Sequence, residues 1–422
     1  MTYRIVADME YDSSGQWCAV SHQPAPYRTR MVVVRPESAA QFSGTVVVNW
    51  QNVTRGFEMG SPPQDLAELG LAWVGVSAQR VGHCGFPGAE SVALKAWDPE
   101  RYGALLHPGD RYSFDVFTQA ARMVGPDRSG LIEGPDPMDG LPVSRMLATG
   151  TSQSALHLRS YANAVQPACK VFDGFFLTLD IGSGAMLDST GSPSNTPLRI
   201  PSVQVRIRDD LGVPVMVVNS ESEVSRYHSV RQPETGSFCL WEIAGSAHIS
   251  RTPTEADAIA RQLQDVGIDP SMGLVRDLGE ANVVPLGPVV RAALRRALFW
   301  LQSGIRPPSQ ALVEVVPGDP PVIRRDEHGI AIGGVRLPDV EAPLAEHCGI
   351  RSEEHEVLKR ITGFSKPFPA AKLADMYSGL DDYMNRYSEA LDAAIGAGIL
   401  LEEERVGLMT ETRITAGQVL SS

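Results

Sequence analysis

The sequence predicts an α/β fold with a mostly parallel central sheet and helices on both faces. Through roughly the first 300 residues, short apolar runs rich in β-branched residues alternate with stretches of helical spacing, as in βαβ units. These runs are apolar throughout, which is typical of strands buried on both faces. At 422 residues the chain is long enough for one large domain or two modest ones.

The predicted elements alternate along the chain. The strand candidates are residues 31–34, 46–50, 71–76, 145–149, 213–218 and 239–243. Segments between them have apolar residues at helical spacing, namely 62–69, 114–123 and 153–164. Because strands alternate with helices, we expect the helices to cover both faces of the sheet.

A further region begins near Pro288. Its apolar residues recur at helical spacing up to Gly304, and Pro307 and Pro308 follow directly, so a helix is expected to end there. Residues 311–316 and 324–341 predict strand and turn pieces. A final helix is predicted from one apolar stripe, which we interpret as core packing: Leu380, Tyr383, Met384, Tyr387, Leu391 and Ala394.

The charge balance argues against two classes of partner. Lys and Arg number 37 against 50 Asp and Glu, a net charge of −13, so no overall positive field attracts nucleic acid or an anionic membrane surface. The sequence has no signal-peptide pattern and no run of about 18 apolar residues, so we expect a cytoplasmic protein. The five cysteines are far apart and never spaced CxxC, which favours reduced thiols.

A short stretch over residues 147–155 contains the main candidate for chemistry. It runs from a predicted strand through a tight turn into a predicted helix, with Ser152 at the turn. A nucleophile elbow needs small residues two before and two after the serine, because strand and helix pass closely there. Gly150 and Ser154 occupy these positions, which gives GxSxS where GxSxG is usual. We therefore predict Ser152 as a nucleophile.

Two acids and a histidine follow later predicted strands. Their chain order, serine then acid then histidine, is one of the orders in which catalytic triads occur. His248 comes shortly after the run 239–243 and is the expected general base. Glu221 and Glu223 both follow the run 213–218. We choose Glu223 because its offset beyond the strand suits a triad acid and Val224 would return the chain to the core; Glu221 remains the alternative.

Acyl transfer also needs an oxyanion hole. The N–H of Gln153, directly after the predicted nucleophile, is the first expected donor. The second is expected in the loop after the run 46–50, where Asn52 or Val53 is placed to supply it.

Beyond these residues, the chain resembles the α/β-hydrolase superfamily, and more narrowly a bacterial group known as α/β-hydrolase domain proteins. The resemblance rests on stretches that include NWQNVTRG, GTSQSA, VNSESEV, WEIAGSAH and DEHGIAIGGVRLPDVEAPLAEHCG. It implies an α/β-hydrolase fold with a triad of Ser152, Glu223 and His248. It also implies a single domain over residues 1–422, in which a core of about 1–304 carries an integral extension of about 305–422. One departure is Ala155, where such elbows often have glycine.

Other polar clusters predict structure instead of catalysis. We interpret Asp110 as part of a turn and helix cap after His107, Asp115 as a residue of the next helix, and residues 326–329 as a hairpin turn. Glycine motifs for nucleotide phosphates are lacking in the sequence, since Gly182-Ser183-Gly184 has no third glycine. We expect neither a metal nor a cofactor.

The sequence thus favours a cofactor-free serine hydrolase acting on a carboxylic ester or lactone. Two alternatives remain open: an acyltransferase with the same triad, and a non-catalytic ligand-binding protein on the same scaffold. The expected partner is a small-molecule ester or lactone, with no nucleic acid and no membrane, and the oligomeric state stays open. An apolar run around Phe175 to Leu179, with Met186, could line a pocket or form a buried strand.

Overall fold

The computed structural model describes residues 1–5, 10–188, 201–250, 264 and 281–420. The chain divides into two compact units. The first comprises Met1–Val217, Ser229–Cys239 and Ala297–Ile305, and the second comprises Val218–His228, Leu240–Arg296 and Arg306–Ser422. In the described part of the chain, no helix combines the length and apolar character that a membrane crossing requires.

A seven-stranded sheet has the strand order β11-β10-β7-β6-β4-β5-β3. β4 pairs in parallel with β5 and β6, β6 pairs in parallel with β7, and β3 pairs antiparallel with β5. This arrangement confirms the predicted α/β class and the mostly parallel sheet. The strands are β3 (Met31–Val34), β4 (Thr45–Trp50), β5 (Ala72–Val76), β6 (Arg145–Thr151), β7 (Gly174–Thr178), β10 (Val215–Ser220) and β11 (Phe238–Ile243).

The buried strands explain the continuous apolar runs. Every residue of β5, β7, β10 and β11 is buried, as expected for strands covered on both faces. The aromatic run at Phe175 and Phe176 lies in β7, so it forms a buried strand. β6 and β10 extend two residues past their predicted ends, to Thr151 and Ser220.

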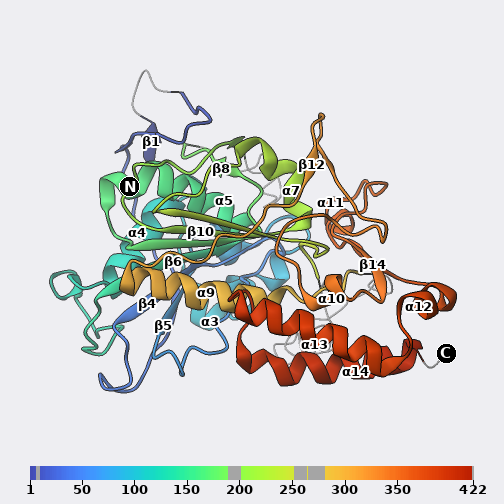
Figure 1. Ribbon diagram of the computed structural model, residues 1–422. Coiled ribbons are helices and arrows are strands. Elements are labelled where there is room, and N and C mark those ends of the chain that lie inside the picture. The colour runs from blue at the N-terminus through green and yellow to red at the C-terminus, as the bar shows by residue number, and fades with distance from the viewer. Residues whose placement is uncertain (6–9, 189–200, 251–263, 265–280, 421–422) are drawn as a thin grey trace. The chain divides into compact units, whose positions relative to one another are not determined.

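Helices of the first unit follow the predicted segments in two of three places. The segments predicted at 114–123 and 153–164 correspond to α4 and α5, the latter continuing as a π-helical turn, η4. Figure 1 shows α4 and α5 beside the strands of this unit. The helices are α1 (Arg80–Cys84), α2 (Leu94–Trp97), α3 (Pro99–Tyr102), α4 (Ser113–Val124), α5 (Gln153–Ser160), η4 (Tyr161–Val165) and α6 (Gln166–Cys169).

The helix predicted at 62–69 is wrong. Residues 64–70 form turns, with a bond from the Leu69 N–H to the Asp65 carbonyl and one from the Leu71 N–H to the Leu66 carbonyl. Pro63 disfavours a helical conformation at the residue before it, and Gly70 takes a left-handed φ of 59° that ends the segment. The stretch is too short to propagate a helix between these breakers.

Short strands complete the first unit, and an aromatic group packs in its core. β1 (Tyr3–Ile5) pairs with β2 (Ala19–Ser21), and β8 (Ser183–Ala185) pairs with β9 (Ser202–Gln204). The ring of Trp50, at the end of β4, lies 5.6 Å from that of Phe114 and 4.8 Å from that of Phe117. These contacts fix α4 against the carboxyl end of β4.

The second unit is largely carboxyl-terminal. α9 (Leu286–Ser303), which begins in this unit, confirms the helix predicted to end at Gly304. In α13 the predicted apolar stripe is largely buried and packs in the core with α14 beside it. Further helices and strands in the described part of this unit are α7 (Glu221–Tyr227), β12 (Val315–Val316), β13 (Val322–Ile323), α10 (Pro338–Glu341), β14 (Ala345–Cys348), α11 (Val357–Arg360), β15 (Phe364–Pro367), α12 (Ala370–Met376), α13 (Leu380–Gly396) and α14 (Arg405–Leu420).

Candidate active site

Ser152 lies at a sharp turn between β6 and α5. Its φ of 60° and ψ of −116° define a backbone conformation that residues other than glycine rarely adopt. Such a backbone costs on the order of 1–3 kcal/mol and persists only where its surroundings enforce it. Here the Ser152 N–H donates to the Thr178 carbonyl of β7 at 2.9 Å, and the Ser152 carbonyl accepts from the Leu156 N–H at 3.2 Å. The turn has the local geometry of a nucleophile elbow.

Small residues around the turn are required by close packing. A Cβ at Gly150 would lie 2.8 Å from Leu158 Cδ1 and 3.0 Å from the backbone carbon of Ser154. Ser154 and Ala155 are themselves fully buried. The GxSxS pattern therefore permits the strand and helix to pass as closely as the elbow demands.

The loop after β4 is fastened to the end of β6 by Asn52. Its side-chain Nδ2 donates to the Thr151 carbonyl at 2.9 Å, and its Oδ1 accepts from the Thr54 N–H at 2.9 Å. The backbone N–H of Asn52 donates to the Met59 carbonyl at 3.0 Å. That N–H is therefore engaged, which leaves Val53 as the expected second oxyanion donor, while the Gln153 N–H, in the first turn of α5, has no intrahelical acceptor.

A buried polar network lies at the start of α5. Gln153 Nε2 donates to Gln79 Oε1 at 2.9 Å, and the same oxygen accepts from Trp50 Nε1 at 3.1 Å. His157 Nδ1 donates to the Gln153 carbonyl at 3.0 Å, and its ring stacks on Trp50. Burial lowers the pKa of His157, so it stays neutral and has a structural role. Sequence reasoning missed Gln79, which carries no local motif.

Glu223 and His248 meet in the second unit. Glu223 Oε1 lies 2.6 Å from His248 Nδ1. Its other oxygen, Oε2, accepts from the Ser220 N–H at 3.0 Å and from the Ser220 hydroxyl at 2.6 Å. This is a capping box, in which the third residue of α7 turns back to the N-cap. The S-x-x-E spacing of residues 220–223 is the sequence signal of such a box, and it favours Glu223 over Glu221.

The contact with Glu223 engages one ring nitrogen of His248 and leaves the other available. The Glu223 side chain is 1% exposed and that of His248 is 13% exposed. A neutral imidazole that donates from Nδ1 to a carboxylate has its Nε2 lone pair free to accept a proton. Ser152 belongs to the first unit, and His248 belongs to the second.

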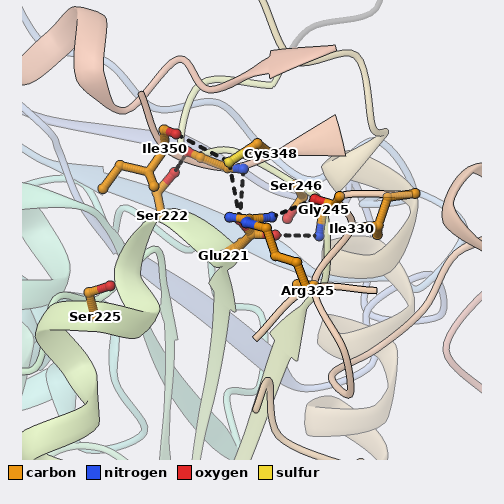
Figure 2. Close-up of polar contacts among 12 residues, drawn as sticks. Glu221, Ser222, Ser225, Gly245, Ser246, Arg325, Ile330, Cys348 and Ile350 are labelled. Atoms are coloured by element: carbon orange, nitrogen blue, oxygen red, sulfur yellow. Dashed lines mark hydrogen bonds and ion pairs between the residues drawn. The ribbon is translucent and has the colours of Figure 1, made fainter. Parts of the chain in front are cut away.

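Glu221 is occupied elsewhere. Its oxygens accept hydrogen bonds from Arg325 Nη2 at 2.6 Å, from the Gly245 N–H at 2.9 Å and from the Gly349 N–H at 3.0 Å (Figure 2). Both glutamates lie in the first turn of α7, because β10 runs on to Ser220 and leaves no loop between strand and helix. The structure therefore pairs His248 with Glu223.

The comparison with known families decides the fold family. The profile of the family described as "Alpha/beta hydrolase domain" matches residues 2–410. This chain belongs to that family. No curated protein sequence matches it.

Solved structures similar to this α/β-hydrolase are remote. A serine hydrolase without a lid from Xanthomonas campestris is 12% identical over 53% of this chain and 86% of that chain, with a TM-score of 0.26. The ferulic acid esterase of Streptomyces cinnamoneus is 15% identical over 61% of this chain and 65% of that chain, with a TM-score of 0.31. Est1E of Butyrivibrio proteoclasticus is 12% identical over 57% and 95% of the two chains, with a TM-score of 0.29. Likeness of this degree says nothing about the substrate.

The other polar residues that the sequence analysis interpreted as structural lie in turns, caps and helices of the α/β-hydrolase. His107 Nε2 donates to the Ala78 carbonyl at 2.8 Å, and Asp110 caps α1 by accepting from the Arg80 N–H at 2.8 Å. Asp115 lies within α4, and residues 326–329 form the predicted turn, closed by the bond from the Gly329 N–H to the Asp326 carbonyl at 3.1 Å. Among the described residues, no group of three or more His, Cys, Asp or Glu side chains could hold a metal ion.

Asn282 is a second residue that the sequence did not reveal. It is fully buried, and its Nδ2 donates to the Gly245 carbonyl at 2.6 Å. Its Oδ1 accepts from the Ser250 hydroxyl at 2.7 Å, and that hydroxyl oxygen accepts from the Ala247 N–H at 2.8 Å. Asn282 thus fixes the loop that carries His248.

Proposed function

We propose that this α/β-hydrolase is a cofactor-free serine hydrolase that cleaves a carboxylic ester or lactone through an acyl-enzyme. The observation that carries the proposal is the strained backbone of Ser152 between β6 and α5. A turn of this kind presents a serine hydroxyl at the carboxyl end of a strand, where α/β-hydrolases have their nucleophile. The Glu223–His248 pair and the chain order of the three residues support the same proposal.

In the proposed first step, Ser152 Oγ attacks the carbonyl carbon of the ester while its proton passes to His248 Nε2. The tetrahedral intermediate collapses as the carbon–oxygen bond to the alcohol breaks. The leaving oxygen takes the proton from His248, and the acyl group stays on Ser152. A water molecule, deprotonated by His248, then attacks the acyl carbon. The bond from that carbon to Ser152 Oγ breaks, Ser152 Oγ takes the proton back from His248, and the acid is released. With a lactone the alcohol remains attached, so one hydroxy acid is released.

Glu223 orients the base in this scheme. A carboxylate at Nδ1 holds the proton there, which keeps Nε2 as the acceptor and stabilises the imidazolium when it forms. The oxygen of the tetrahedral intermediate would be held by the N–H groups of Gln153 and Val53. One such donor contributes about 10²- to 10³-fold to kcat.

A fluorophosphonate probe tests the nucleophile. We expect the probe to label the native protein at Ser152, as located by peptide mass spectrometry, and to leave Ser152→Ala unlabelled. Ser154→Ala is the matched control, because it removes a serine hydroxyl next to the same turn, and the Ser154 side chain is fully buried. Labelling that persists in Ser152→Ala, or native protein that hydrolyses esters without ever being labelled, contradicts the proposal.

Product analysis tests hydrolysis itself. With a panel of esters and lactones in water, we expect free acid to form without any added alcohol or amine. Ester consumption that requires such an acceptor would identify an acyltransferase. Tight binding of one ligand with no turnover across the panel would identify a binding protein.

A further inference from the structure

Glu221 is a buried carboxylate with an unusually complete set of partners. Its side chain is fully buried, whereas the Arg325 side chain that pairs with it is 26% exposed. Figure 2 shows Glu221 against the Arg325 guanidinium, with Gly245 and Cys348 close by. Burying a carboxylate costs several kcal/mol unless charge and hydrogen bonds compensate it, so this arrangement calls for an explanation beyond helix capping.

The partners of Glu221 come from separate segments of the second unit. Gly245 lies three residues before His248, Gly349 directly follows β14, and Arg325 follows β13. Glu221 also uses its own backbone, because its N–H donates to the Ser246 carbonyl at 3.1 Å. One residue therefore ties the start of α7 to the His248 loop at two points.

Ser222 adds a second connection to the same loop. Its hydroxyl oxygen accepts from the His248 N–H at 2.8 Å, and its hydroxyl donates to the Gly349 carbonyl. Gly349 is thus held by Glu221 through its N–H and by Ser222 through its carbonyl. The backbone of His248 is fixed through these contacts to the helical turn that carries Glu223.

We propose that Glu221 and Arg325 are positioning residues for the general base: their ion pair holds the His248 loop on the first turn of α7, where Glu223 meets the imidazole. The role rests on the proposed function, since it gives His248 a catalytic task. Arg325 is itself oriented, because Nη1 donates to the Gly329 carbonyl at 3.0 Å.

The charges around the pair are consistent with this role. Arg325 Nη2 places a positive charge 2.6 Å from Glu221 Oε1, and Glu346 is a further acidic group that acts on Arg325. Cys348 Sγ lies 3.7 Å from Glu221 Oε1, and burial together with the Glu221 charge raises the pKa of this thiol to about 11. The thiol therefore stays neutral and adds no second negative charge beside Glu221.

The test compares Arg325→Met with Arg336→Met in the full chain. Arg336 is a matched control, because its side chain is 25% exposed and forms ion pairs with Glu341 and Asp326, and its hydrogen bonds go to Ala331, Val340 and Glu341. We expect Arg325→Met to lower kcat by about tenfold to a hundredfold with KM unchanged, since small displacements of a catalytic group have effects of this size. Arg336→Met should keep the native kcat.

A proton NMR measurement reads the base without relying on turnover. The short Glu223–His248 contact should give a low-field Nδ1–H resonance in the native protein, which Arg325→Met shifts or broadens and Arg336→Met leaves in place. Arg325→Lys keeps the charge and should recover most of the lost kcat. Glu221→Gln provides the same test if Arg325→Met does not fold, because the arginine left behind can reach water.

The outcomes separate this inference from the proposed function. If Arg325→Met and Glu221→Gln only lower the melting temperature and keep the native kcat and low-field resonance, the pair is structural and the inference is overturned. If the native protein is never labelled at Ser152 but the resonance still responds to Arg325→Met, the hydrolase proposal fails and the positioning of His248 stands.

Discussion

Ser152 and His248 are held by different kinds of structure. Ser152 is fixed by its own backbone, in a strained turn whose close packing depends on neighbours two residues away on either side. His248 is fixed by side chains that lie 25 and 26 positions earlier in the chain, those of Glu223 and Ser222. The conformation of Ser152 thus depends on residues close in sequence, whereas the position of His248 depends on residues distant in sequence.

The difference indicates how each region should respond to substitution. A strained turn stores energy that a more permissive residue can release. A buried polar network loses about 1–3 kcal/mol for each donor or acceptor left without a partner. Removing a partner around His248 should therefore be damaging, whereas glycine at position 152 can relieve strain at the turn.

The largest effect is expected at the contact between acid and base. Glu223→Gln cannot hold the Nδ1 proton as a carboxylate does, so we expect kcat for ester hydrolysis to fall by about 10³- to 10⁴-fold. Ser220→Ala is the control, since it removes part of the capping box and leaves Glu223 in place; a cap of this kind stabilises by about 1 kcal/mol. A Glu223→Gln protein with nearly native kcat would show that this carboxylate does not orient the base.

Asn282→Ala tests the network in the second unit. It leaves the Gly245 carbonyl and the Ser250 hydroxyl without their partner, so we expect a loss of about 3 kcal/mol in the free energy of unfolding, measured by urea denaturation. Asn52→Ala in the first unit removes only two hydrogen bonds, and Asn52 is half-buried. Its loss should be about 1 kcal/mol, and equal losses would remove the contrast between the regions.

His347, on β14, gives the second unit a sensitivity to acid. Burial lowers the pKa of His347 from 6.5 to about 4, so the folded chain keeps the ring neutral. The unfolded chain takes up a proton below pH 6.5, and the free energy of unfolding therefore falls as the pH drops. Between about pH 7 and about pH 5 this group should account for about 2 kcal/mol.

His347→Gln should remove that component and keep a hydrogen bond to Ser365, which accepts or donates at 2.8 Å in the native protein. The measurement is the difference in unfolding free energy between native protein and variant at the two pH values. Other buried histidines are present in both proteins and cancel. A difference that does not change with pH would mean that His347 titrates alike in the folded and unfolded chains.

The smallest effect is expected at the strained turn. Glycine adopts a φ of 60° without a Cβ penalty, so Ser152→Gly should be more stable than Ser152→Ala by about 1 kcal/mol after the greater freedom of glycine in the unfolded chain is counted. Thermal unfolding of the two inactive variants measures this directly. If Ser152→Ala were as stable as Ser152→Gly, the turn would carry no strain.

The same contrast explains what the sequence could predict. The elbow around Ser152 was predictable because strand, turn and helix follow one another within a few residues. The strands were predictable for a similar reason, since each is one apolar run. The helix predicted at 62–69 was wrong because the segment is bounded by Pro62, Pro63 and Gly70, which outweigh its apolar spacing.

Contacts between residues distant in sequence have no comparable sequence signal. Arg325 meets Glu221 across 104 positions of the chain, and Asn282 meets Gly245 across 37. Neither belongs to a motif, because each acts through the fold and not through its neighbours. The engagement of the Asn52 N–H with Met59 was equally hidden, since it depends on how one loop closes.

The capping box at Glu223 has an evolutionary consequence. One carboxylate oxygen starts α7 and the other contacts the imidazole. An aspartate is one methylene shorter and could not reach both groups from the same backbone position. A lineage that exchanged this acid for aspartate would therefore weaken the start of α7, by about 1 kcal/mol, in the same step that alters the contact with the imidazole.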